Sequence, residues 1–205
     1  MFLKFKTIVN NPVSSNCHII YDDLKKCGLV VDPGSEDSRE ILAFVKDNNL
    51  HIDYVILTHE HFDHIWAAEK FNVPVLCTRE CKDGLSDKKR NLSLFFNQIG
   101  FELNVKAECI EEYGDIFVWN DCKLEFCKNG AHSPGGLMFV ADKYVLTGDF
   151  LIKDLKTVTK IKWARKEELL DGEIWLQQHK GKGLLVLAGH GDRFELDNYD
   201  LNKIY

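Results

Sequence analysis

The stretch Thr58-His59-Glu60-His61-Phe62-Asp63-His64 (THEHFDH) directly follows the apolar run YVIL at positions 54–57. Three histidines and two carboxylates therefore stand where a buried strand is predicted to end. Imidazole and carboxylate groups are the donors that zinc and similar metals prefer. In an extended segment side chains alternate between faces, so His59, His61 and Asp63 can point one way while His64 begins a helix. The stretch predicts ligands for two neighbouring metal positions.

Three later predicted strand edges each carry one more candidate ligand. His132 lies in the loop GAHSPGG at 130–136, Asp149 ends the stretch LTGD at 146–149, and His190 stands between glycines in LAGHGD at 187–192. Small neighbours let the backbone approach a compact site without steric conflict. Each residue alone is consistent with a turn former, and the opening stretch alone with a solvated turn. The joint pattern instead predicts a metal site that comprises His59, His61, Asp63, His64, His132, Asp149 and His190.

The rest of the chain alternates predicted strands and helices. The strands of the first half are predicted at Phe2–Val9, Asn16–Tyr21, Cys27–Val31, Tyr54–Leu57 and Val73–Cys77. Its helices are predicted from an N-cap at Ser35, at Ile65–Lys70 and within Arg79–Gly100. The second half has strands predicted at Ile116–Trp119, Lys123–Cys127, Leu137–Val140, Lys143–Leu146 and Leu184–Leu187, and a helix at Lys166–Gln178. Two strand-rich halves with outer helices predict a layered α/β sandwich.

The composition is typical of one globular domain over residues 1–205. The chain is 45% hydrophobic and 28% charged, which allows a sizeable core. It has no apolar run of membrane-spanning length and no signal-peptide h-region, so we expect a cytoplasmic protein that does not associate with membranes. The net charge of -6 argues against nucleic-acid binding. Seven cysteines at loose spacings predict reduced core thiols rather than disulfides or a separate zinc site.

Two segments outside these motifs are candidates for substrate contact. Asp83–Phe101 contains Leu94-Phe95-Phe96 and is interpreted as an amphipathic helix that buries its aromatic residues, in preference to a lid over the site. Lys153–Lys166 is basic and follows Asp149. It is either a solvated face, the commoner case, or a surface that attracts a small anionic substrate. The histidines that match no ligand position are His18, His51 and His179.

The motif set resembles that of the metallo-β-lactamase superfamily and, within it, the glyoxalase II-like hydrolases (hydroxyacylglutathione hydrolases). The likeness comprises HxHxDH after an apolar strand, a histidine in a Gly/Ser/Pro loop, TGD and GHG, and extends from Asn16 to Gly191. It implies a four-layer αββα sandwich with two metals at one edge between the sheets. It also implies His59, His61 and His132 around one metal, Asp63, His64 and His190 around the other, and Asp149 bridging both.

Two features depart from the glyoxalase II pattern. Those enzymes bind glutathione partly through a helical extension after the last ligand, whereas here about fifteen residues follow His190, so dedicated glutathione thioester hydrolysis is not expected. Their loop places the histidine directly after a glycine, whereas this chain reads Gly130-Ala131-His132, a shift that could alter the placement of that ligand. His61 stands where the di-iron flavoprotein branch has a glutamate, which argues against that branch.

The chemistry of such a site follows from its donors. Two divalent ions about 3.5 to 4 Å apart can share a hydroxide and clamp the group under attack. Asp149 can reach both ions, and Asp63 either ligates a metal or orients the attacking water. We therefore predict a dinuclear hydrolase, with zinc preferred over iron or manganese, that attacks an ester, thioester or lactone bond of a small metabolite by a metal-bridged hydroxide. The alternatives are a mononuclear iron persulfide dioxygenase-like oxidoreductase, a non-catalytic metal-binding module and a nucleic-acid phosphodiesterase.

Overall fold

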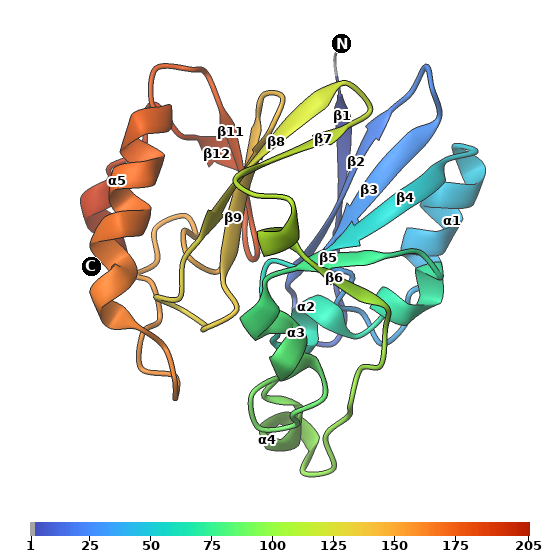
Figure 1. Cartoon of the computed structure of the whole chain (residues 1–205), viewed down its shortest axis with the longest axis horizontal. Coiled ribbons are helices and arrows are strands. Elements are labelled where there is room, and N and C mark those ends of the chain that lie inside the picture. Colours follow the sequence, from blue (N-terminus) through green and yellow to red (C-terminus); the bar gives the residue numbers. More distant parts are fainter. Residues whose placement is uncertain (1–2) are drawn as a thin grey trace.

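The computed structural model describes residues 3–205, so the predicted strand start at Phe2 lies outside the described residues. Within that range the strands form two six-stranded sheets that face each other (Figure 1). The first sheet has the order β1-β2-β3-β4-β5-β6, and its strands are β1 (Lys4–Val9), β2 (Asn16–Asp22), β3 (Cys27–Val31), β4 (His51–Ile56), β5 (Val75–Cys77) and β6 (Ala107–Cys109). The second has the order β12-β11-β10-β9-β8-β7, and its strands are β7 (Ile116–Trp119), β8 (Cys122–Lys128), β9 (Leu137–Ala141), β10 (Tyr144–Gly148), β11 (Leu185–Ala188) and β12 (Phe194–Glu195).

Helices cover the outer side of each sheet. On the first sheet they are α1 (Arg39–Asp47), α2 (Phe62–Ile65), α3 (Arg79–Leu85) and the 3-10 turn η1 (Ala68–Phe71). The helix α4 (Ser93–Asn97) lies at one end of the molecule, and the 3-10 turn η2 (Ile110–Glu112) packs Ile110 in the core between the sheets. On the second sheet they are α5 (Leu169–His179) and the 3-10 turns η3 (Lys166–Glu168) and η4 (Leu201–Ile204). Figure 1 shows α1 and α5 on opposite outer sides of the pair of sheets.

The alternation of side chains along each strand explains the layers. In β3, Leu29 and Val31 pack in the core between the sheets, whereas Val30 packs in the outer core beneath the helices. In β10, Leu146 faces the central core and Val145 faces the layer of α5. Strands buried on both faces are apolar at every position, which is why these runs stand out in the sequence. The predicted αββα sandwich is confirmed.

Parallel pairing brings the ends of several strands to one edge. β3, β4 and β5 run parallel, with Val31 opposite Ile56, and β10 runs parallel to β11, with Gly148 opposite Ala188. Because parallel strands end at the same side of a sheet, the loops that follow them are neighbours. An isolated bridge between Ser15 and His190 links the two sheets at this edge. The loops of both sheets therefore converge there.

Two predicted helices begin or end elsewhere. Ser35 does not cap a helix: its hydroxyl donates to Asn10 Oδ1 at 3.1 Å and accepts from the Asn11 amide at 3.0 Å, and α1 starts at Arg39. The helix predicted at 65–70 is two separate turns, α2 and η1. The Ala67 amide donates to the carbonyl of Pro33 at 2.7 Å, which takes it out of a continuous helical ladder.

The segment 79–100 differs most from the prediction. It forms the two short helices α3 and α4 instead of one amphipathic helix, and the residues on either side of α4, Leu92 and Gln98, have left-handed backbone angles. The prediction that its aromatic residues are buried is wrong, because Phe95 is 70% exposed and Phe96 is 45% exposed. The short strands β6 and β12 were not predicted, since runs of two or three residues carry little periodicity.

The prediction of reduced cysteine thiols agrees with the structure. All seven cysteines are free, and five of them are buried. Across residues 3–205, every helix falls short of the length and apolar character that a membrane span requires.

Phe139, which is fully buried in the core between the sheets, should make a large contribution to stability. Phe139→Ala is expected to lower the free energy of unfolding by about 3–5 kcal/mol, because it removes buried area and leaves a cavity. The matched control is Leu24→Ala, at a side chain that is 96% exposed, which should change it by no more than about 0.5 kcal/mol. Urea denaturation of both variants measures the difference, and equal effects would contradict the central position of Phe139.

Candidate metal centre

The converging loops bring all seven predicted site residues together. They fall into three overlapping groups, and the potential ligand atoms within each group lie within 4.8 Å of one another. The groups are His59, His61 and His132; His59, His64 and Asp149; and Asp63, His64 and His190. Four of the seven residues come from the segment after β4, with Asp63 and His64 in α2, whereas His132, Asp149 and His190 lie in loops that follow β8, β10 and β11 of the second sheet. The cluster therefore lies between the two halves of the sandwich.

Asp149 lies in the middle of the cluster. Its Oδ1 is 3.5 Å from His64 Nε2, and its Oδ2 is 3.6 Å from His132 Nε2 and 3.5 Å from His190 Nε2. Asp63 Oδ2 is 3.3 Å from His190 Nε2 and 3.6 Å from His64 Nε2. The Asp149 carboxylate thus lies within 3.6 Å of candidate ligands on both sides of the cluster, His132 on one side and His64 and His190 on the other.

The histidines are oriented by acceptors behind the cluster. His132 Nδ1 lies 3.0 Å from the carbonyl of Val158, and His190 Nδ1 lies 3.2 Å from the carbonyl of Ser14. A carbonyl oxygen only accepts, so Nδ1 carries the proton in both rings and Nε2 keeps its lone pair for a ligand. The Gly-Ala-His spacing noted in the sequence does not keep His132 away from the cluster, since its Nε2 is 3.2 Å from His61 Nδ1.

Asp32 is a functional candidate that the sequence reasoning missed. Its Oδ1 accepts from the Thr58 amide at 2.7 Å, and its Oδ2 accepts from the Thr58 hydroxyl at 2.6 Å and from His64 Nδ1 at 3.0 Å. Because the Thr58 hydroxyl donates to Asp32, its oxygen accepts from His59 Nδ1, which lies 3.0 Å away. One buried carboxylate therefore sets the proton positions of two imidazoles and leaves both Nε2 atoms facing the cluster.

The donor atoms fit a bound cation. His59 Nε2, His64 Nε2 and Asp149 Oδ1 are buried and have no hydrogen-bond partner among the described residues. A buried polar atom without a partner costs about 1–3 kcal/mol, so a folded chain normally satisfies such atoms. A divalent ion would satisfy all three, and nitrogen and oxygen donors of this kind suit zinc, iron or manganese.

The histidines of the cluster differ in the direction of their pKa shifts. Burial lowers the pKa of His59 and His61 well below the usual 6.5, so both imidazoles are neutral at pH 7, as ligation requires. Burial also opposes the charge of His64, but Asp63, Asp149 and Asp32 outweigh it and raise the pKa of His64 to about 10. A proton and a metal ion therefore compete for His64 Nε2.

Small residues make room for the cluster. A Cβ atom at Gly189 would lie 2.2 Å from Asp149 Oδ1 and 2.9 Å from His64 Cε1. A Cβ atom at Gly34 would lie 1.4 Å from the carbonyl oxygen of Asp63. Both glycines are needed because the neighbouring backbone approaches the cluster too closely for any side chain.

The other histidines have structural surroundings. His18 is buried, with Nδ1 3.0 Å from Thr7 Oγ1 and Nε2 2.9 Å from the carbonyl of Ala188. His179 is buried with Nδ1 2.8 Å from the carbonyl of Trp175, and His51 is exposed. These three histidines lie outside the three groups of potential ligands.

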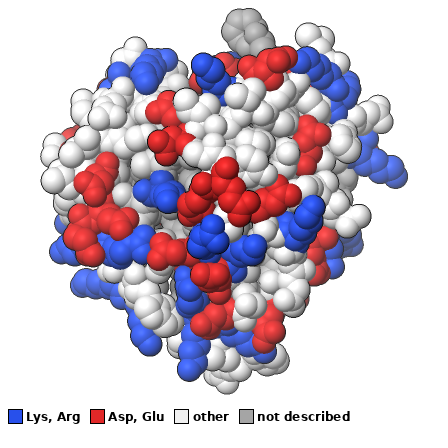
Figure 2. All heavy atoms as spheres, in the orientation of Figure 1, with Lys and Arg blue, Asp and Glu red and all other residues white. Residues whose placement is uncertain are grey.

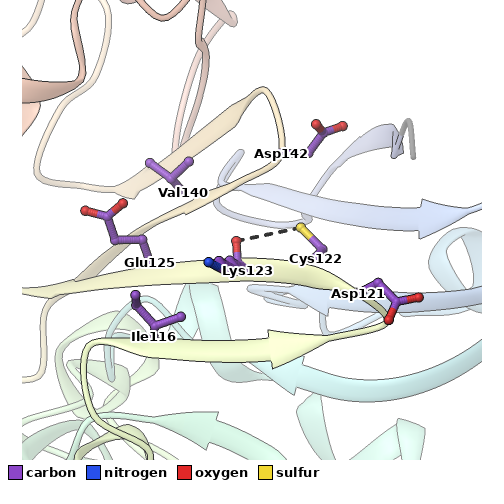
Figure 3. Close-up of a pocket in the computed structure, with 7 residues that line it drawn as sticks. All are labelled: Ile116, Asp121, Cys122, Lys123, Glu125, Val140 and Asp142. Carbon is purple, nitrogen blue, oxygen red and sulfur yellow. Dashed lines mark hydrogen bonds between the residues drawn. The ribbon is translucent and has the colours of Figure 1, made fainter.

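The basic segment 153–166 supports the cluster through its backbone, because the carbonyl of Val158 is the acceptor for His132. Its five lysines are exposed, in agreement with a solvated face, and Arg165 pairs with Glu80 at 2.9 Å. Figure 2 shows basic and acidic side chains interspersed on the face seen in Figure 1. A separate cavity of about 400 Å³ lies on the second sheet, and the seven described residues that line it include none of the predicted ligands (Figure 3).

Comparisons with known proteins agree with this geometry. The model of the metallo-beta-lactamase superfamily matches residues 10–190. A Bacillus subtilis protein named "Probable metallo-hydrolase YqgX" is 30% identical over 199 residues, which are 92% of this chain and 90% of that protein. "Hydroxyacylglutathione hydrolase GloC" of Haemophilus influenzae is 24% identical over 182 residues, 86% and 85% of the two chains. The crystal structure of BLEG-1 B3 metallo-beta-lactamase has a TM-score of 0.84 at 22% identity, covers 94% of each chain and shows the likeness of fold.

Asp32→Asn should weaken metal binding about 10- to 100-fold, because an amide cannot accept all three hydrogen bonds that orient Thr58 and His64. Asparagine tolerates the left-handed backbone of Asp32, where φ is 52°. Asp121→Asn is the matched control, at an exposed aspartate whose φ is 63°. Zinc affinity is measured by competition with a chromophoric chelator. Equal affinities in the two variants would show that Asp32 does not support the metal site.

Proposed function

Because this chain belongs to the metallo-β-lactamase superfamily, we propose that it is a dinuclear metal-dependent hydrolase that cleaves an ester, thioester or lactone bond of a small molecule. The observation that carries the proposal is the set of three buried, unpartnered donor atoms, on His59, His64 and Asp149, that face one another between the sheets. We propose that residues 1–205 form one hydrolase domain.

Each donor has a proposed place. His59, His61 and His132 would hold one ion, Asp63, His64 and His190 the other, and Asp149 both. Two divalent ions bound there supply hydroxide at neutral pH and polarise the carbonyl under attack. Zinc is our preferred metal, and iron or manganese would suit the same donors.

The protein's own groups have distinct tasks in this scheme. Burial opposes the charge of Asp63, but His64 and His190 outweigh it and lower the pKa of this carboxyl to about 2. Asp63 is therefore ionised at neutral pH and can ligate an ion or accept a hydrogen bond from the attacking water. Asp149 fixes the spacing between the two ligand sets. Asp32, Thr58, Ser14 and Val158 hold the imidazoles in the ligating tautomer.

A thioester is the bond class we favour. The Haemophilus influenzae relative is named a hydroxyacylglutathione hydrolase, and hydroxyacylglutathione is a thioester. A cysteine nucleophile is disfavoured, because burial raises the pKa of the Cys17 and Cys81 thiols well above the usual 9.0. The ionised Asp63 and the ligand cluster instead support direct attack by water.

Asp149→Ala is expected to lower hydrolysis by at least about 100-fold, since both ligand sets lose their shared carboxylate. The protein should still fold, and each set keeps its own histidines. His51→Ala is the control, at an exposed histidine outside the cluster, and should retain parental turnover. Turnover of a simple thioester and metal content are measured for both variants at one pH. Near-parental turnover and metal content in Asp149→Ala would refute the dinuclear scheme.

Metal content gives an independent test. Protein purified without added metal is expected to contain about two transition-metal ions per chain, because the donors divide into two sets. Elemental analysis together with a panel of esters, thioesters and lactones checks this expectation. A single iron ion at high occupancy, together with oxygen uptake on persulfide substrates, would contradict the hydrolase proposal and support an oxidoreductase.

A further inference from the structure

The segment 87–101 exposes three large apolar side chains beside the candidate metal centre. Phe95 is 70% exposed, Phe96 45% and Ile99 76%. Single exposed apolar residues are ordinary, but several on one short segment form a patch of the kind that binds ligands. In Figure 1, α4 lies at the same end of the molecule as α2, the helix that carries Asp63 and His64.

A buried polar framework holds this segment in shape. Asn91 and Ser93 are buried. The side-chain amide of Asn91 donates to the carbonyls of Leu85 at 3.2 Å and Phe101 at 2.9 Å. The Ser93 hydroxyl donates to Asn91 Oδ1 at 2.6 Å. The Phe101 amide donates to Ser93 Oγ at 2.9 Å. The exposed aromatic residues therefore lie on a loop that is closed by its own hydrogen bonds.

The same segment is attached to the ligand motif. The Phe62 amide donates to the carbonyl of Asn91 at 2.7 Å, and Arg90 Nη2 lies 3.6 Å from Glu60 Oε1. The ring centroids of Phe62 and Phe96 are 4.7 Å apart, and Trp66 is 6.2 Å from Phe96. Phe62 stands in the chain between His61 and Asp63. The exposed ring of Phe96 thus packs against a buried residue whose two chain neighbours are both candidate ligands.

We propose that Trp66, Phe95, Phe96 and Ile99, named here the acyl platform, bind the apolar acyl chain of the substrate. The proposal rests on the hydrolase function proposed above, because the carbonyl of that acyl group would lie at the metal centre. A small ligand fits the platform better than a protein partner, since a stable protein interface needs about 20–30 residues on each side. The substrate class is therefore a thioester whose acyl group carries an apolar chain.

The experiment compares acetyl, butanoyl and hexanoyl thioesters that share one thiol leaving group. In the parent, kcat/KM should rise about fourfold for each added methylene that is buried on the platform. The double variant Phe95→Ser/Phe96→Ser should lose most of this rise, so that its hexanoyl-to-acetyl ratio falls about tenfold or more. Leu24→Ser, at a remote side chain that is 96% exposed, is the matched control and should keep the parental ratio.

A binding measurement separates the two proposals. Hexanoate and acetate are titrated against each protein by tryptophan fluorescence, to which Trp66 contributes. The platform is supported if the parent binds hexanoate more tightly than acetate and this preference is lost in the double variant but kept in Leu24→Ser. If the same pattern is found but no thioester is hydrolysed, the platform stands and only the proposed hydrolase function is refuted. A double variant that keeps the chain-length preference in either measurement overturns the platform. A parent that shows no chain-length preference in either measurement also overturns the platform.

Discussion

The candidate centre depends on one buried carboxylate and its three hydrogen bonds. Asp32, directly after β3, accepts from the backbone amide and hydroxyl of Thr58, which follows β4, and from His64. These bonds exist because β3 and β4 run parallel in a register that places their carboxyl ends side by side. In a buried site with few competing waters such bonds are strong, and breaking one would leave a charged group unsatisfied. The positions of His59 and His64 are thus a direct consequence of strand pairing.

The candidate ligands could be selected from the sequence because four of them lie within one short stretch, where donor type and spacing are visible. His132, Asp149 and His190 were recognisable only jointly, since each alone matches an ordinary turn. Asp32 was missed because its role depends on register across two strands, and its Asp-Pro-Gly context indicates only a turn. The signal that could have identified Asp32 is that a second apolar strand, 27–31, also ends directly before an acidic residue.

The fold was predictable to the same extent and for related reasons. Doubly buried strands such as β3 and β10 are recognisable from apolar runs alone, whereas β6 and β12 are too short for any period to appear. Phe95 and Phe96 were assigned to the core because their spacing fits an amphipathic helix. The left-handed residues Leu92 and Gln98 interrupt that helix, and the buried side chain of Asn91 takes the interior position instead. Such tertiary hydrogen bonds leave no periodic trace in the sequence.

The division of the candidate ligands between the two halves of the sandwich links the stability of the protein to its metal content. His59, His61, Asp63 and His64 belong to the N-terminal half, and His132, Asp149 and His190 to the C-terminal half. An ion held by both would act as a further cross-link between two halves that a hydrophobic core and several hydrogen bonds already join. Ligands that bind only the folded state stabilise it in proportion to the logarithm of their concentration. Metal starvation would then favour local opening of the sandwich, and the turnover of the chain by proteases would follow the metal supply.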